Sequence, residues 1–209
     1  MLQDIAAEKG LKVGSAPDTF LGGAHQQARA HIDSGAVGTI TSGTAIVLSR
    51  GMEHWHPNPD FFFQPGAGPV LDLGPYYLAN LINLIGPVKR VAALLLEFEQ
   101  GATITMLSSW DVWAHRHFDM ELYGTGGSLY VPDPNFFGGT VMAGGNNFSE
   151  VEPLQPWDHP FGKPNQEHDA KASANYRAAG LADMAVAILH GRDHRCSLER
   201  ALHAVDVMT

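Results

Sequence analysis

The chain has 209 residues, 44% of them hydrophobic, which is enough to bury a core and favours one domain or slightly more. Its formal net charge is −9, and this balance disfavours binding to nucleic acid or to an anionic membrane surface. No apolar run approaches the length of a membrane span, while a single cysteine, Cys196, excludes an intrachain disulfide and favours a cytoplasmic location.

The first quarter of the chain predicts helix, helix and strand. Residues 1–9 are expected to be helical and to end at Gly10, and the short apolar stretch 11–13 allows at most one strand. A second helix is expected over about residues 22–34, closed by Gly35. Residues 37–48 are rich in Thr, Ile and Val and predict a strand.

The middle of the chain predicts a long helix followed by a series of strands. An aromatic and proline-rich loop, 51–68, leads to a helix that begins at Pro69 and ends at Gly86. Strands are expected at 88–98, 102–108, 117–123 and 128–131. Tight turns at 99–101 and 124–127 would make neighbouring strands antiparallel.

The last third is expected to be loop over 143–168 and helix over 172–190 and 197–208. Helices and strands in this order, with the strands grouped together, predict an α+β fold.

The helix that begins at Pro69 carries the strongest functional pattern. Asp72, Tyr76, Asn80 and Asn83 form a narrow polar stripe opposite a broad apolar face. A solvated stripe would normally carry Lys, Glu or Arg, so these residue types favour a sheltered polar pocket. The alternative is structural, with Asp72 stabilising the helix start and Tyr76 packing against the sheet. Glycines just before the helix would allow a ligand or another backbone to approach closely.

The loop before this helix supplies further candidates. His54 and His56 alternate with Trp55, so in an extended stretch both imidazoles would point the same way. They could donate hydrogen bonds to sugar hydroxyls, together with Asn58, or cap backbone groups in an ordered loop. A metal site would need further ligands, and no HxxxH or HExxH pattern is present. We therefore predict no metal, and the repeated spacing at His115 and His117 is interpreted in the same way.

Two other residues are weaker candidates for substrate binding. Trp110 at a strand end could form a pocket wall, although a buried tryptophan is usually part of the core. Arg177 before the penultimate helix could reach a ligand, although a surface arginine needs no such role. No G-x-S-x-G sequence is present, which excludes a serine hydrolase of that type.

Four stretches of the sequence together resemble the Gfo/Idh/MocA family, which includes glucose–fructose oxidoreductase and inositol dehydrogenase. The resemblance spans nearly the whole chain, and it is carried by residues 16–22 (APDTFLG), 32–38 (IDSGAVG), 66–77 (GAGPVLDLGPYY) and 121–129 (ELYGTGGSL).

The resemblance implies an α+β domain with a large, open, mostly antiparallel sheet. Helices would cover one face, and the other face would pack against a second subunit, giving a homo-oligomer. It also implies hydride transfer between NAD or NADP and a hydroxyl carbon of a sugar, polyol or related small molecule. Asp72 corresponds to an active-site aspartate of the family, and Tyr76 stands where relatives usually carry a histidine. A phenol, with an ordinary pKa of about 10, can also donate or accept a proton.

Other features depart from the family pattern. No G-x-G-x-x-G phosphate-binding turn occurs, so a complete Rossmann domain and its cofactor-binding residues are not expected in this chain. The family's Glu-Lys-Pro motif with its catalytic lysine is also absent. The region 88–98 lacks a connecting excursion that relatives carry, and the end at Thr209 is early, so we expect a remnant or fragment of a longer enzyme. Residues 1–14 would be the end of a nucleotide-binding domain, and 15–209 a substrate-binding and oligomerisation domain.

These observations lead to three hypotheses. The first is the substrate-binding half of an NAD(P)-dependent oxidoreductase, inactive alone, with Asp72 and Tyr76 at the reacting carbon. His56, Asn58, Asn80, Trp110 and Arg177 would shape its pocket. The second is a non-catalytic sugar-binding or assembly module, and the third is a metal enzyme based on histidine.

Overall fold

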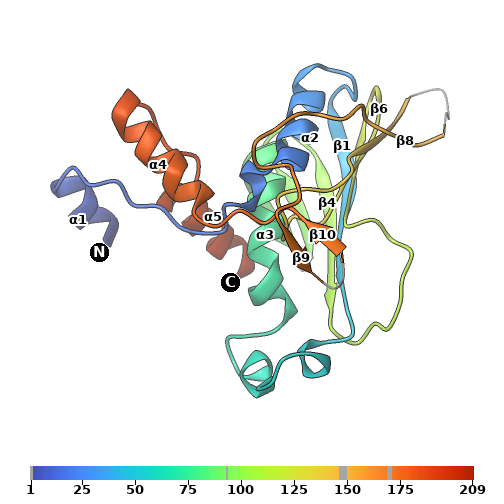
Figure 1. The fold of residues 1–209 in the computed structure, drawn as a ribbon, viewed down its shortest axis with the longest axis horizontal. Coiled ribbons are helices and arrows are strands. Elements are labelled where there is room, and N and C mark those ends of the chain that lie inside the picture. The colour runs from blue at the N-terminus through green and yellow to red at the C-terminus, as the bar shows by residue number, and fades with distance from the viewer. Residues whose placement is uncertain (1, 93, 146–149, 169–170) are drawn as a thin grey trace.

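The computed structural model describes residues 2–92, 94–145, 150–168 and 171–209 (Figure 1). Its helices and strands form an α+β fold with an open, mostly antiparallel sheet, as the sequence predicts. Within the described residues, the main sheet has the order β2-β3-β4-β1-β5-β6-β7-β8, and β9 and β10 form a separate pair. The strands are β1 (Ile40–Leu48), β2 (Val88–Ala92), β3 (Leu95–Phe98), β4 (Thr103–Ser109), β5 (Met120–Gly124), β6 (Gly127–Val131), β7 (Met142–Gly145), β8 (Glu152–Pro153), β9 (Gln166–His168) and β10 (Lys171–Ser173).

The two central strands, β1 and β4, run parallel, whereas the other pairs of the sheet are antiparallel. Their register runs from Ser42 opposite Thr103 to Leu48 opposite Ser109. A parallel pair needs a crossover connection, which is supplied here by α3 (Pro69–Ile85) and the β2–β3 hairpin. As a result, the loops that follow Leu48 and Ser109 leave the sheet at the same edge.

The core lies between this sheet and the helices α2 (Gly23–Asp33), α3 and α5 (Leu198–Met208). Helix α3 packs against β1 and β4, α2 against β6 and α5 against β2. Strand alternation supplies the sheet side of the core, since Ile104 and Met106 are buried while Thr105 and Leu107 between them are exposed. Figure 1 shows α3 beside the central strands, whereas α1 (Leu2–Glu8) and α4 (Ala179–His190) lie at the far side of the molecule from the sheet.

Several predicted elements are confirmed with small shifts of their ends, namely α1, α2, α3, α5, β1, β4, β5 and β6. The predicted antiparallel neighbours are also confirmed, including the turn that joins β3 to β4. Ser197 caps α5 by accepting a hydrogen bond from the Arg200 backbone, as its residue type favours.

Three local predictions are wrong. Residues 88–98 form the β2–β3 hairpin and not one strand, because the chain reverses near Leu94 inside an uninterrupted apolar run. The predicted helix over 172–190 begins at Ala179, since Ala178 has a φ of 64° and residues 171–173 pair with β9. The predicted loop over 143–168 contributes β7, β8 and β9. Residues 11–13, which allowed at most one strand, form none.

Candidate functional site

A cleft of about 620 Å³ opens between the start of α4, the middle of α3 and the segment before α2. This volume lies in the range of small-molecule sites. Many of the side chains that line the cleft are polar or aromatic and can bind a ligand. They include Asp18, Thr19, Tyr76, Asn135, Gln166, Asn175, Tyr176 and Arg177.

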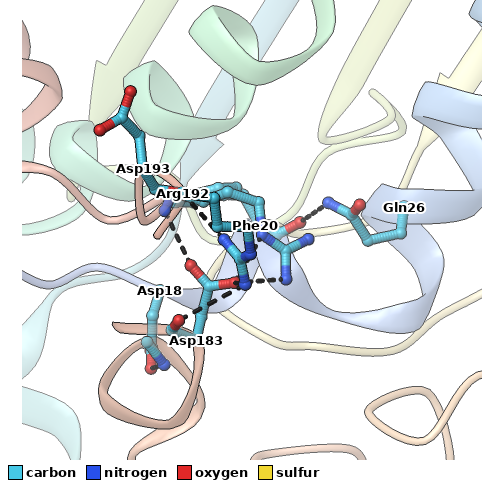
Figure 2. Close-up of polar contacts among 8 residues, drawn as sticks. Asp18, Phe20, Gln26, Asp183, Arg192 and Asp193 are labelled. Atoms are coloured by element: carbon cyan, nitrogen blue, oxygen red, sulfur yellow. Dashed lines mark hydrogen bonds and ion pairs between the residues drawn. The ribbon is translucent and has the colours of Figure 1, made fainter. Parts of the chain in front are cut away.

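The wall of the cleft is held together by a carboxylate at the start of α4. Asp18 precedes the short 3-10 helix η1 (Thr19–Leu21), and its Oδ2 accepts a hydrogen bond of 2.6 Å from the Gly180 backbone. A helix N-terminus has unpaired N–H groups and favours negative charge, so this contact fixes α4 against η1. On the other side, the Gln26 side chain of α2 donates a 2.7 Å hydrogen bond to the Phe20 carbonyl (Figure 2).

A second carboxylate, within α4, fixes the segment that follows this helix. Figure 2 shows the contacts of Asp183, whose side chain is only 3% exposed. Its Oδ1 accepts from Arg192 Nη2 at 2.8 Å and from Arg195 Nε at 3.0 Å, and its Oδ2 accepts from the Arg195 backbone at 2.7 Å. Burial would raise the pKa of Asp183, but these hydrogen bonds and the two guanidinium charges more than offset burial, so the pKa is lowered.

The two predicted catalytic residues lie one turn apart on α3. Tyr76 is half-buried, lines the cleft and also packs against the core. Asp72 is half-buried in the first turn, and burial raises its pKa above the ordinary value for an aspartate. Asp72 is not among the residues that line the cleft, so the structure brings Tyr76 into it and leaves Asp72 just outside.

Asn80, a predicted pocket residue, is fully buried and belongs to the core. Its Nδ2 lies 2.9 Å from Nδ1 of His25, and Nε2 of His25 lies 2.8 Å from the Phe136 carbonyl, to which it donates. Burial lowers the pKa of His25 to about 4, although the Phe136 carbonyl acts in the opposite direction. Since Phe136 lines the cleft, Asn80 supports the cleft wall from behind.

Three other predicted residues, His56, Asn58 and Trp110, lie at the edge of the sheet where β1 and β4 end. His56 and Trp110 are part of a cluster of aromatic rings there. This aromatic cluster contains His54, Trp55, His56, Phe61, Phe62, Phe63, Trp110 and Trp113. The Asn58 backbone donates a 3.1 Å hydrogen bond to Nδ1 of His56. Trp110 is 5% exposed, with its ring 5.9 Å from that of Phe62 and 5.5 Å from that of Phe63. His56, Asn58 and Trp110 therefore lie together, but none of them lines the cleft.

Arg177 lies in the cleft wall, in an exposed position just before α4. The neighbouring Tyr176 donates its hydroxyl to the Lys163 carbonyl at 2.7 Å, which orders the segment that carries Arg177. Tyr76 and Arg177 are thus the two predicted site residues that the cleft brings together.

Sequence reasoning missed much of the cleft. Thr19, Asn135 and Gln166 come from three distant segments, and no spacing in the sequence links them. His25 was also missed, although its place three residues before Ala28, on the buried side of α2, was compatible with burial.

Among the described residues, no three His, Cys, Asp or Glu side chains gather closely enough to hold a metal ion. The rings of His115 and His117 stack with their centroids 6.1 Å apart. None of the described helices combines the length and apolar character that crossing a membrane requires.

An open sheet covered by helices on one face, with a polar cleft on the helical side, defines an α+β domain with a site of small-molecule size. Residues 25–96 match the family model of the GFO/IDH/MocA C-terminal domain. The resemblance predicted from the sequence is thereby confirmed over these residues, and the chain has the fold of that domain. No curated protein sequence matches the chain significantly.

Solved structures of oxidoreductases share this fold. The aldose-aldose oxidoreductase of Caulobacter crescentus, in complex with glycerol, has a TM-score of 0.71 at 19% identity, over 99% of this chain and 62% of that one. An oxidoreductase of Agrobacterium radiobacter, in complex with NAD+, L-tartaric acid and magnesium, has a TM-score of 0.70 at 15% identity, over 99% and 64%. A 3-ketoreductase of Actinomadura kijaniata, in complex with TDP-benzene and NADP, has a TM-score of 0.65 at 20% identity, over 99% and 63%.

This chain therefore spans less than two thirds of the length of each of these three structures.

Proposed function

We propose that this chain is the substrate-binding part of an NAD(P)-dependent oxidoreductase that acts on a hydroxyl carbon of a sugar, polyol or related compound. The observation that carries the proposal is the position of Tyr76, in the wall of a polar cleft and one helical turn after the half-buried Asp72. The fold supports it, because the similar solved structures are oxidoreductases: one is in complex with NAD+ and L-tartaric acid, one with NADP and TDP-benzene, and one with glycerol.

The two side chains have complementary chemistry for a hydroxyl substrate. The Asp72 carboxylate can accept a hydrogen bond from a substrate hydroxyl, and its raised pKa brings it closer to the range useful for proton transfer. The Tyr76 phenol can donate to or accept from the same or a neighbouring hydroxyl. Arg177 and the amides of Asn135 and Gln166 can bond the remaining polar groups of the substrate.

The residues of this chain do not fit a dinucleotide site. The sequence has no G-x-G-x-x-G turn. Within the described residues, β1 and β4 are the single parallel pair, whereas a mononucleotide-binding βαβαβ unit needs three parallel strands. We therefore assign no proton or hydride step to the cofactor here. In the proposal, the nicotinamide is presented by a nucleotide-binding unit outside residues 15–209.

Exposed apolar residues on α1 and α4 support this division of the protein. Leu181 and Leu189 of α4 are 66% and 82% exposed, and Leu2 of α1 is 69% exposed. Apolar side chains gathered on one side of a domain usually mark a surface that another unit covers. We propose that residues 1–14 belong to the end of that nucleotide-binding unit, and that the complete protein acts in the cytoplasm.

The open face of the sheet supports a homo-oligomer. Leu95 of β3 and Leu107 of β4, both 43% exposed, lie on the face opposite the helices, as does Thr105 of β4, which pairs with Leu95. A self-complementary contact through such a face would bury these side chains.

Calorimetric titration of the chain with myo-inositol and D-glucose tests the proposed site. We expect saturable binding that Asp72→Asn and Tyr76→Phe each weaken at least about tenfold, the effect of losing one hydrogen bond to a charged or well-ordered partner. Tyr130→Phe, a half-buried tyrosine on β6 outside the cleft, is the matched control and should bind as the unmodified chain does.

Two results would contradict the proposal. Unchanged polyol binding in both variants would favour the non-catalytic binding or assembly module, which uses the same fold without this pair. Saturable micromolar binding of NAD or NADP to the chain alone would show that no separate nucleotide-binding unit is needed.

A further inference from the structure

The aromatic cluster exposes an unusual amount of ring surface to solvent. Trp113 is 75% exposed, Trp55 68%, Phe63 54% and Phe61 52%. Large aromatic side chains are normally buried, and exposed groups of them mark a binding surface. Trp55, Phe61 and Phe63 belong to one group of ring contacts, and Trp113 with His54 forms a second. These four residues lie in two segments that are brought to the same edge of the sheet by the parallel pairing of β1 and β4.

The exposed rings are held in place by contacts along their edges and from below. His54 meets the Trp113 ring edge-on, with centroids 5.3 Å apart, and the Arg50 guanidinium lies 5.6 Å from the same ring. His56 contacts Trp55 and Phe61 in the same edge-on manner, at 5.3 and 5.4 Å. The rings are therefore positioned before any ligand arrives, which reduces the entropy lost on binding.

Hydrogen-bonding groups are interleaved with the rings. Glu53, Asn58, Asp60 and Asp111 are exposed in the same two segments. Trp110, beneath the cluster, has an Nε1–H with no hydrogen-bond partner among the described residues. Apolar ring faces with carboxylates, an amide and imidazoles nearby match a neutral ligand that has an apolar face and a hydroxyl-rich edge. The carboxylates disfavour binding to an anionic membrane surface.

The cluster is also continuous with the proposed catalytic helix. Residues 64–68 lead from Phe63 directly into α3, whose first turn carries Asp72 (Figure 1). The exposed rings of Phe61 and Phe63 are therefore close along the chain to the turn that carries Asp72.

We propose that the aromatic cluster is a saccharide-stacking site, which binds further sugar units of a glycosyl-linked substrate. A pyranose ring presents an apolar C–H face to an aromatic ring and directs its hydroxyls sideways, where Asn58 and the carboxylates lie. The assignment of the reacting unit to Asp72 and Tyr76 rests on the proposed function, but the stacking site has its own residues and can be tested separately.

The test is titration of the full chain with cellotriose, maltotriose and glucose, followed by tryptophan fluorescence and calorimetry. At least one trisaccharide is expected to bind ten or more times as tightly as glucose. Trp55→Ala and Trp113→Ala should each remove most of that difference. The matched control is Trp157→Ala, which removes a 43% exposed tryptophan outside the cluster and should leave it unchanged.

Each other outcome would overturn the stacking site. Equal affinity for glucose and both trisaccharides, or an equal loss in Trp157→Ala, would show that the cluster does not select extended saccharides. A change in oligomeric state on sedimentation of Trp113→Ala, with trisaccharide binding intact, would assign the cluster to contact between copies of the chain. Failure of the proposed function gives a different pattern, since Asp72→Asn and Tyr76→Phe would leave glucose binding unchanged while the trisaccharide preference persisted.

Discussion

The cleft wall and the aromatic cluster are built on different principles. In and behind the cleft wall, the half-buried Asp18 and the buried Asp183 and His25 are fixed by short hydrogen bonds. In the aromatic cluster, most ring pairs meet edge-on, and Trp55, Phe61, Phe63 and Trp113 are exposed. Residues behind the cleft wall therefore contribute to stability and site geometry together, whereas the exposed rings of the cluster can be changed with little effect on the fold.

Removal of Asp183 should have the largest effect on stability. Asp183→Ala leaves the Arg195 backbone N–H and two guanidinium groups without their acceptor, and we expect the free energy of unfolding to fall by about 3 kcal/mol. Chemical denaturation measures the change. Asp193→Ala, which removes a fully exposed carboxylate in the loop between Arg192 and Arg195, is the control and should not change the midpoint. A matching loss in both variants would refute the special role of the buried carboxylate.

Acid should destabilise the cleft wall through His25. Its pKa is about 4 in the folded state and 6.5 when unfolded, so the unfolded chain binds more protons between these values. The stabilisation is complete above pH 6.5 and is lost as the pH falls towards 4. At pH 5 the loss from this group is about 2 kcal/mol.

Denaturation at pH 7 and pH 5 tests this assignment. His25→Gln, which keeps a donor for the Phe136 carbonyl, should reduce the difference between the two pH values by about the same 2 kcal/mol. His117→Gln, an exposed histidine, should not. An unchanged pH profile in His25→Gln would mean that another group titrates.

Changes in the aromatic cluster should have the smallest effect on stability. Trp113→Ala removes a side chain that is 75% exposed, and the free energy of unfolding should change by no more than about 0.5 kcal/mol. Thermal unfolding by circular dichroism measures it. A loss comparable with that of Asp183→Ala would show that the cluster is part of the folding core, and the contrast between the two regions would disappear.

The parts of the fold that follow from local pattern could be predicted from the sequence. The apolar face of α3 and the glycine-rich turn between β5 and β6 are encoded in neighbouring residues. The reversal near Leu94 could not be predicted, because an apolar run without glycine or proline hides it. The polar stripe of α3 was identified, but it is divided between the cleft and the core, since Asn80 faces His25 of another helix.

The candidate site was predictable only in part for the same reason. Tyr76 was found because it repeats at helical spacing with Asp72, a relation that a single sequence displays. Thr19 and Gln166 reach the cleft through the packing of η1 and β9, which depends on contacts between distant segments. Arg177 was found by residue type alone, and its place in the cleft depends on how α4 is fixed by Asp18.

The parallel pairing at the centre of the sheet also has a kinetic consequence. Ser42 can meet Thr103 only after the chain between them has been brought together, and closing so long a loop is entropically unfavourable. The β2–β3 hairpin and α3 can form from local contacts within that loop, which shortens the effective search. The meeting of β1 and β4 is therefore the high-contact-order step that should limit the folding rate of this domain.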